Sequence, residues 1–422
     1  MHRHTALQCL FALGALACGP GETSPMDAPT WHEDIRPVFE ATCTSCHTAQ
    51  GGISGIPLNT YEDALAWREP IAAAVAAGTM PPWRADTGCA DYEDDFSLSP
   101  DDLTAILAWA AADGPEGDPS NAAPTAAPWT PPTLERVDRV LLMPEPFAPT
   151  AAPDDYRCVI LDWTEEETVW VSGYNFLPGN TDIVHHVIPF IIPPEDVETF
   201  RALDDAEPGE GYTCYGGPGG DIDSLINARW LGGWAPGGGA TVLPAGYGLQ
   251  VEAGSIVVMQ VHYNIDVLDG QTDQSGLEIQ FERTPLAYAE VQPWTDVNWV
   301  LGLGMDIPAG GTAVEHTFSH TFEDMSLDLH SATLHMHTLG QTATLSVLHA
   351  DGSESCLLSH SDYDFNWQRE YWLTEPVTVQ SGDTLQLSCT WDNPTDETVA
   401  WGDGTGDEMC LGITLLTPHQ TF

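Results

Sequence analysis

The sequence predicts a multidomain protein, with a small all-α domain followed by two all-β antiparallel sandwiches. The chain has 422 residues, a length typical of two to four domains, and 42% of them are apolar, which is enough for several buried cores. Its 39 Gly and 33 Pro disfavour a mostly helical protein. Helical patterns are confined to residues 31–118, and short alternating apolar and polar runs follow from about residue 134.

The charge of the chain excludes two classes of partner. It carries 63 Asp and Glu against 11 Lys and Arg, a formal net charge of −52. A nucleic-acid-binding protein needs a basic surface, and an anionic membrane would repel this chain. We therefore expect no nucleic-acid partner, and contact with a membrane only through an N-terminal lipid anchor.

The chain begins with the pattern of an export signal. His2-Arg3-His4 precede an apolar run, Ala6–Ala17, which is too short to span a bilayer as a helix. Ala15-Leu16-Ala17-Cys18 resembles a bacterial lipobox, although Leu usually stands three residues before the Cys. We predict residues 1–18 as a lipoprotein leader with Cys18 lipidated, and residues 19–30 as a tether. The expected location is periplasmic or cell-surface, on the outer membrane of a Gram-negative bacterium, and secretion without a lipid is the alternative.

The first domain is predicted to contain three helices, at Trp31–Ala41, Tyr61–Ala77 and Ser99–Asp113. Ser99 is a suitable N-cap for the third, and Pro100 a suitable first helical residue. Residues 119–149, which begin with a stretch rich in Pro and Ala, are predicted as an interdomain linker.

The rest of the chain is predicted as strands separated by turns of Gly, Pro, Asp and Asn. The clearest strands are Thr168–Asn175, Ser255–Asn264, Gly276–Glu282, Ala343–His349 and Thr384–Thr390. The region is too long for one sandwich, so we expect two, over residues 150–290 and 291–422.

A C-x-x-C-H motif in the helical region is formed by Cys43, Cys46 and His47. Two thiols at this spacing can add to the vinyl groups of a haem, and the following His becomes the proximal iron ligand. A dithiol redox pair or a structural zinc site is the alternative, which the adjacent His and the export signal disfavour.

The sixth iron ligand is expected to be Met80, which stands in a loop stiffened by two prolines. His32 is the weaker competitor. The placement resembles the small class I cytochrome c domain, and it implies one covalently bound haem c over residues 31–118.

Three groups of His and one Met in the β region have the residue types of metal ligands. They are His185-His186, His262, His335 with His337, and Met409. Residues i and i+2 of a strand share a face, so the third group can hold one ion, whereas two adjacent His can share an ion only at a strand end or a β-bulge. Imidazoles with a thioether suit copper, and zinc gains little from Met. The alternative is that these His are structural and the Met is a core residue.

Six motifs along the chain share one order with a known family. They are Asp155-Tyr156-Arg157-Cys158, Val184-His185-His186-Val187, Trp234-Ala235-Pro236-Gly237-Gly238 with Leu243-Pro244, Gln260-Val261-His262-Tyr263, His335-Met336-His337 and Asp407-Glu408-Met409-Cys410. In these motifs residues 150–418 resemble the copper type II, ascorbate-dependent monooxygenases, the family of peptidylglycine α-hydroxylating and dopamine β-monooxygenases. All six expected ligand types occur in the expected order.

The resemblance implies two sandwiches of jelly-roll type, each holding one copper. It implies an electron-transfer copper and an oxygen-activating copper, the second held by the catalytic residues. The implied ligands are His185, His186 and His262 for the first copper, and His335, His337 and Met409 for the second.

The resemblance also implies the disulfides Cys158–Cys214 and Cys389–Cys410, the latter next to Met409. Cys89 and Cys356 have no partner in the family. They either pair with each other across the domains or include a free thiol, and the sequence leaves this open.

Two positions depart from the peptide-hydroxylating members. Thr333 replaces an Arg that binds a substrate carboxylate, and Leu411 replaces an Asn. Amidation of glycine-extended peptides is therefore not expected. Together with the acidity of the chain, this favours a neutral or cationic, partly apolar substrate.

The sequence as a whole predicts an exported copper monooxygenase that hydroxylates a C–H bond of an organic substrate with O2. Two copper ions and one haem c are the expected cofactors. The attached haem has a high effective concentration near the first copper and would deliver electrons, with ascorbate or another one-electron donor as an external source. Two alternatives are a haem–copper electron-transfer or redox-sensing protein without oxygenase activity, and a non-enzymatic surface binding module.

Overall fold

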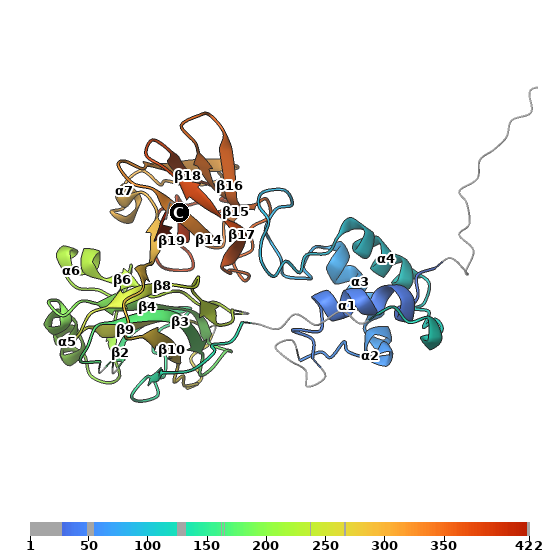
Figure 1. Cartoon of the computed structure of the whole chain (residues 1–422), viewed down its shortest axis with the longest axis horizontal. Helices are drawn as coiled ribbons and strands as arrows, with labels where there is room; N and C mark the ends of the chain where they lie inside the picture. The colour runs from blue at the N-terminus through green and yellow to red at the C-terminus, as the bar shows by residue number, and fades with distance from the viewer. Residues whose placement is uncertain are drawn as a thin grey trace, which may run out of the picture. The chain divides into compact units, whose positions relative to one another are not determined.

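A computed structural model of the chain describes residues 28–48, 55–124, 132–161, 163, 165–236, 238–265 and 267–419 (Figure 1). The predicted leader, including Cys18, and most of the tether lie outside the described residues. The chain divides into two compact units, of which unit 1 comprises residues 1–81 and 98–128 and unit 2 comprises residues 82–97 and 129–422. No described helix combines the length and the apolar character needed to cross a membrane.

Unit 1 is helical where it is described, as the sequence predicts. Its helices are η1 (Trp31–Ile35), α1 (Arg36–Thr42), α2 (Tyr61–Ala66), α3 (Arg68–Ala76), α4 (Pro100–Ala111) and η2 (Pro119–Asn121). The Ser99 side chain accepts a hydrogen bond from the Asp102 N–H, so the predicted N-cap of α4 is confirmed. Ile106 and Trp109, three residues apart on α4, are fully buried in the core of this unit.

Unit 2 consists mainly of strands. In chain order they are β1 (Arg139–Leu142), β2 (Asp154–Leu161), β3 (Val169–Leu177), β4 (Val184–Ile192), β5 (Tyr212–Thr213), β6 (Arg229–Trp230), β7 (Thr241–Val242), β8 (Tyr247–Val251), β9 (Ile256–Asn264), β10 (Gly276–Glu282), β11 (Ala287–Tyr288), β12 (Glu290–Trp294), β13 (Val314–Thr321), β14 (Leu327–His335), β15 (Gly340–Leu348), β16 (Glu354–His360), β17 (Tyr371–Val379), β18 (Thr384–Trp391) and β19 (Leu411–Pro418). The helices between them are α5 (Val197–Ala206), α6 (Ile222–Asn227) and α7 (Val297–Val300).

The five clearest strand predictions are confirmed by β3, β9, β10, β15 and β18. Strand β18 alternates strictly between buried and half-buried residues, as expected of a strand with one covered face. Strand β9 is buried from Ile256 to Tyr263, because the core of the first sandwich covers one face and the cluster that includes α5 covers the other.

Three sheets build unit 2, and its strands pair antiparallel except for β8 with β11 among the described pairs. Their strand orders are β1-β10-β3-β8-β11 with β7 beside β3, β17-β14-β19-β12-β6-β4-β9-β2-β5, and β13-β18-β15-β16. The mostly antiparallel β-sandwich architecture that the sequence predicts is therefore confirmed.

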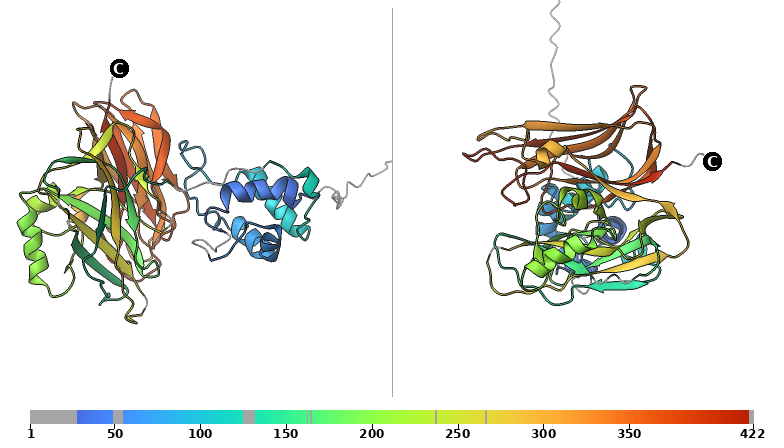
Figure 2. Two further views of the ribbon diagram at one scale, coloured as in Figure 1. Left: turned by 60° about the horizontal axis from the view of Figure 1, so that its bottom comes forward. Right: turned by 90° about the vertical axis from the view of Figure 1, so that its left-hand side faces the viewer.

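The nine-stranded sheet belongs to both sandwiches (Figure 2). Its β4-β9-β2 end packs against the six-stranded sheet, with side chains such as Val261 and Ile279 in one core. Its β14-β19 end packs against the four-stranded sheet, with Leu334 and Leu387 in another. Strand β12 bonds to β19 on one side and to β6 on the other. This continuity explains why the two expected sandwiches form one compact unit.

The first sandwich begins earlier in the chain than residue 150. Strand β1 lies in the predicted linker 119–149 and pairs with β10 along its whole length. The pairing is stabilised because Leu141 and Met143 are buried in the core of the first sandwich.

Residues 82–97, which we call the strap, belong to unit 2 and interrupt the predicted helical domain of residues 31–118. A disulfide joins Cys89 to Cys356, which answers the pairing that the sequence left open. Tyr92 forms an antiparallel bridge with Leu373. The strap therefore packs on the second sandwich through a covalent bond and through backbone pairing.

Candidate metal centre

Three histidines from two neighbouring strands meet in the first sandwich. His185 and His186 lie on β4, and His262 lies on β9. The pairing register between these strands shifts by one residue between Val184 and His186, which is the signature of a β-bulge. The bulge places both adjacent histidines beside His262, so the structure contains the irregularity that a shared ion requires.

The three imidazoles have the spacing of metal ligands. The Nδ1 atoms of His185 and His186 are 3.3 Å apart, and those of His186 and His262 are also 3.3 Å apart. One ring nitrogen from each lies within 4.8 Å of the others. Nitrogens bound tetrahedrally at about 2.0 Å from an ion stand roughly 3.3 Å apart, so the geometry suits one small metal ion.

A carboxylate behind His262 orients its ring. The Nε2 atom of His262 lies 2.9 Å from Oδ1 of Asp154 on β2 and donates its proton to it, which leaves the Nδ1 lone pair toward the other two rings. Burial, followed by the neighbouring histidines, lowers the pKa of His185 to about 3 and the pKa of His186 well below its usual value. Neutral imidazoles are the form that binds metals.

The second group lies at the end of β14. Met336 is buried in the core of the second sandwich, so His335 and His337 on either side of it face the other way and line one cavity. The Nδ1 atom of His335 bonds to the side-chain oxygen of Gln368, and Nδ1 of His337 donates to the backbone oxygen of Asp407 at 3.1 Å. Each ring therefore keeps its Nε2 atom for a metal. Burial lowers the pKa of His335 to about 3 and of His337 to about 4.

Met409 lines the same cavity, and its loop is held on both sides. The carboxylate of Glu408, which is fully buried, accepts hydrogen bonds from the backbone N–H of His337 at 2.9 Å and from the indole N–H of Trp391 at 2.8 Å. The disulfide Cys389–Cys410 follows directly in the chain. Anchors of this kind fix the position of a weak thioether ligand.

The two histidine groups are neighbours within unit 2. A cavity of about 420 Å³ is lined by His186 from the first group and by His335, His337 and Met409 from the second. The ring centroids of His186 and His335 are 5.8 Å apart. The Phe365 ring stacks on His185 at 4.6 Å and meets His337 edge-on at 5.9 Å. One cavity therefore serves both groups.

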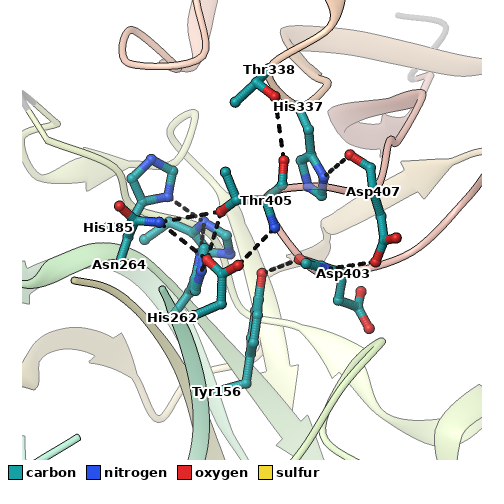
Figure 3. Close-up of polar contacts among 12 residues, drawn as sticks. Tyr156, His185, His262, Asn264, His337, Thr338, Asp403, Thr405 and Asp407 are labelled. Carbon is teal, nitrogen blue, oxygen red and sulfur yellow. Dashed lines mark hydrogen bonds and ion pairs between the residues drawn. The ribbon is translucent and has the colours of Figure 1, made fainter. Parts of the chain in front are cut away.

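Asp154 connects the first group to the loop that carries the thioether, because it bonds to both His262 and Thr405, which are labelled in Figure 3. Besides His262, its carboxylate accepts hydrogen bonds from the backbone N–H of Thr405 at 2.9 Å and from the Thr405 hydroxyl at 2.6 Å. Asp407, two residues further along this loop, supplies the oxygen that orients His337. The network ties a strand of the first sandwich to a loop of the second.

Four residues of the centre carry no recognisable signal in the sequence, namely Asp154, Phe365, Gln368 and Glu408. Asp154 precedes a quoted motif by one residue, and Glu408 stands within one, but neither spacing indicates a partner. Each acts through a contact with a residue more than 30 positions away, which a local pattern cannot reveal.

The structure contains the two disulfides that the resemblance implies. Cys158 is joined to Cys214, and Cys389 to Cys410. The first bridges β2 to the segment that follows β5, with Cys158 four residues along β2 from Asp154.

In unit 1, the residues of the C-x-x-C-H motif lie at the end of α1. The Nδ1 atom of His47 bonds to the backbone oxygen of Ile56 at 2.9 Å, an arrangement that leaves Nε2 for iron. Cys43 and Met80 pack against the same core of unit 1. His32, the weaker candidate for the sixth ligand, lies 3.5 Å from the carboxylate of Glu116.

The donor sets fit the metals that the sequence predicts. Three imidazoles in the first group and two imidazoles with a thioether in the second suit copper, since sulfur favours Cu(I) and imidazole serves both oxidation states. The hydrogen-bond partners behind the rings, Asp154, Gln368 and the Asp407 carbonyl, set the ring tautomers in the way that metal-bound histidines require.

Comparison with known proteins points to the same chemistry. Residues 300–415 match the C-terminal domain of the copper type II ascorbate-dependent monooxygenases. The human DBH-like monooxygenase protein 1 is 25% identical over 255 residues, 57% of this chain and 40% of that protein. The dopamine beta-hydroxylase of Equus caballus is 30% identical over 263 residues, again 57% and 40%. The tyramine beta-hydroxylase of Caenorhabditis briggsae is 24% identical over 254 residues, covering 57% and 41%.

The chain spans about 40% of the length of the curated relatives that it matches. Among solved structures, a recombinant N-glycanase F aligns with 67% of this chain and 96% of its own length, at 11% identity and a TM-score of 0.29. The sequence matches show that the chain is similar to the copper type II ascorbate-dependent monooxygenases, with the family match at residues 300–415.

Proposed function

We propose that this protein is a copper-dependent monooxygenase that hydroxylates a C–H bond of an organic substrate. The reaction would be R–H + O2 + 2e− + 2H+ → R–OH + H2O. The observation that carries the proposal is one cavity lined by His186, from the group of three histidines, and by both histidines and the methionine of the second group. The first group would hold the electron-transfer copper and the second the oxygen-activating copper, and copper supplies the one-electron and dioxygen chemistry that side chains lack.

The residues around the ions have separate tasks in this proposal. Asp154 and Gln368 keep His262 and His335 in the tautomers that present a lone pair. Glu408 fixes the loop before Met409. Phe365 packs against rings of both groups, and so limits access of water to the space between them.

The haem part of the proposal concerns unit 1. Cys43 and Cys46 would bind the haem covalently, with His47 and Met80 as axial ligands. The haem would pass single electrons to the copper held by His262 and its two partners, in place of ascorbate or between ascorbate and copper. Support comes from the motif itself and from the His47 ring, whose Nδ1 is already bonded to a backbone oxygen. Export, and lipidation at Cys18, belong to the same proposal.

The test is the metal and haem content of the full chain, expressed with its leader in a host that matures c-type haem. We expect two coppers and one haem per chain. The variants His262→Ala and His335→Ala should each lose one copper, because each removes a ligand of a different group. The exposed His320 on β13 lies outside the cavity, and His320→Ala is the matched control that should keep both coppers.

The reaction is then tested with 18O2 and ascorbate, by mass spectrometry of products from a panel of neutral, cationic and anionic compounds. One 18O atom per product molecule, lost in His335→Ala, is expected. A chain that binds no copper after reconstitution contradicts the enzyme proposal. Two coppers without haem would overturn only the haem part.

A further inference from the structure

Two short helices of unit 2 expose aliphatic side chains to solvent. On α6, Ile222 and Ile226 are 76% and 74% exposed, and on α7, Val297 is 65% exposed, with Leu301 directly after the helix at 68%. Surface helices of globular proteins normally turn such residues inward. In a chain with a net charge of −52, a concentration of exposed aliphatic residues marks a place where apolar material binds.

Both helices reach the cavity of the candidate metal centre. Leu225 and Ile226 of α6 and Val300 of α7 line it, together with His335 and His337. Figure 1 shows α6 on the first sandwich and α7 on the second. Leu225, Ile226 and Val300 are 41%, 74% and 41% exposed and also line the cavity, so exposed aliphatic side chains of both helices reach its wall.

Two arginines line the cavity, and each already contacts other groups. The guanidinium of Arg369 lies over the rings of Trp83 and Phe96, at 5.1 and 4.8 Å from their centroids. Arg229 also lines it, and its guanidinium bonds to the backbone oxygen of Gln250. An anionic ligand would instead meet the carboxylates of Glu290 and Glu370.

The two carboxylates of the wall already have partners. Glu290 accepts a hydrogen bond from the Tyr288 hydroxyl at 3.0 Å, and Glu370 accepts one from the Ser331 hydroxyl at 2.6 Å. The remaining lining is largely aromatic and aliphatic, including Trp230 and Trp234. A ligand without charge fits these surroundings best, because it requires no charge to be left unpaired.

We propose that α6 and α7 form the entrance for the substrate, and that the substrate is an uncharged apolar molecule with an alkyl or aryl body. This inference rests on the proposed function, because only an enzyme has a substrate. Binding of the apolar molecule itself requires no metal. The exposed aliphatic side chains of α6 and α7 would contact the ligand as it passes from solvent into the cavity, which a site reached only through polar loops would not require.

The experiment measures binding of the neutral fluorescent probe N-phenyl-1-naphthylamine to the copper-free full chain. We expect saturable binding with one site per chain. The double variants Ile222→Ser/Ile226→Ser and Val297→Ser/Leu301→Ser should each weaken it by roughly tenfold, the loss of two apolar contacts. Val267→Ser is the matched control, because Val267 is also aliphatic and 70% exposed but does not line the cavity. This change should leave binding of the probe unchanged.

Competition against the probe then tests the charge of the ligand. Butylbenzene should displace it better than 4-phenylbutyrate and 4-phenylbutylamine. Stronger displacement by the amine or by the acid overturns the uncharged class. Equal probe binding by the helix variants and the control overturns the entrance.

Two further outcomes would show that the exposed side chains of α6 and α7 contact something other than a small apolar molecule. A wild-type dimer in sedimentation that the helix variants dissociate would make the helices a contact between copies of this chain. Binding to phosphatidylcholine vesicles that the same variants abolish would make them a membrane contact. Either of these results would overturn this inference. If the chain still binds two coppers, the proposed function is unaffected.

Discussion

At the scale of residues, two carboxylates near the metal ligands show how surroundings set charge. Burial disfavours the ionised form of Asp154, but hydrogen bonds from His262 and Thr405 outweigh it and hold the pKa of this carboxyl well below its usual range. For Glu408 the balance is reversed, because burial outweighs the bonds from Leu339 and His337 and raises its pKa to about 7. Asp154 is therefore charged at neutral pH, as suits a partner of a metal-bound imidazole.

Asp154→Asn should weaken copper binding by the first histidine group, by about 10- to 100-fold. The amide keeps the size of the side chain but loses the charge that orients His262. Cu(I) affinity, measured by competition with a coloured chelator, checks this prediction. The His335→Ala background isolates the first histidine group, and the His262→Ala background isolates the second. Asp328→Asn, at a half-buried carboxylate that is bonded to His419 and lies outside the cavity, is the control. Equal weakening of both sites would show a general loss of structure instead.

At the scale of elements, the segment between β16 and β17 has two tasks. It supplies Phe365 and Gln368 to the metal centre. It also receives the strap, since Arg84 forms ion pairs with Asp362 at 3.0 Å and with Asp364 at 2.7 Å. The strap therefore packs directly against the segment that orients His335.

Replacing both cysteines of the strap disulfide, Cys89→Ser/Cys356→Ser, should lower the free energy of unfolding of unit 2 by about 2–4 kcal/mol. The crosslink closes a long loop, since its ends are 267 residues apart in sequence, and this restricts the unfolded chain. Urea denaturation of the metal-free chain measures the loss. The control is Met325→Ser, at an exposed side chain, with a change within about 0.5 kcal/mol. An unchanged midpoint in the double variant would mean that the strap is held by its other contacts alone.

At the scale of the whole molecule, buried carboxyls and buried histidines together set how stability depends on pH. Burial and a neighbouring carboxylate raise the pKa of Asp403 to about 6, and burial also raises the pKa of Glu370. A raised pKa means that the folded state binds the proton more tightly, so stability increases as the pH falls through that value. Glu165 is the opposite case, since bonds from Arg139 and Arg283 outweigh burial and lower its pKa.

The buried histidines of the metal centre act in the same direction as Glu165. Their pKa values in the folded chain lie well below the ordinary value of about 6.5, so the unfolded chain binds protons that the folded chain excludes, and stability is lost as the pH falls below about 6.5. The melting temperature of the metal-free chain should therefore be lower at pH 5.5 than at pH 7.5, because these histidines together outweigh raised carboxyls such as Asp403. Protonation of paired carboxylates such as Glu165 should lower it further at pH 3.5. Calorimetry at the three pH values checks this, and a melting temperature that is highest at pH 5.5 would contradict the prediction.

Elements with a local period, and the residue types of the candidate ligands, can be predicted from the sequence alone. The alternation in β18 and the cap at Ser99 are local, since they depend on residues within a few positions of each other. The six ligand candidates were recognisable because their residue types are rare in combination and their order matches a family. His335 and His337 are two residues apart, and this spacing alone predicts that both side chains lie on one face of a strand.

Features that depend on contacts between distant segments become visible only in the folded chain. The bulge at His185 needs β9 as its pairing partner, and Asp154 is recognisable as a support only beside His262, 108 residues away. The pairing of Cys89 with Cys356 and the continuity of one sheet through both sandwiches are of the same kind. Packing brings these groups together across long stretches of chain, and no period or spacing along the sequence records which distant surfaces meet.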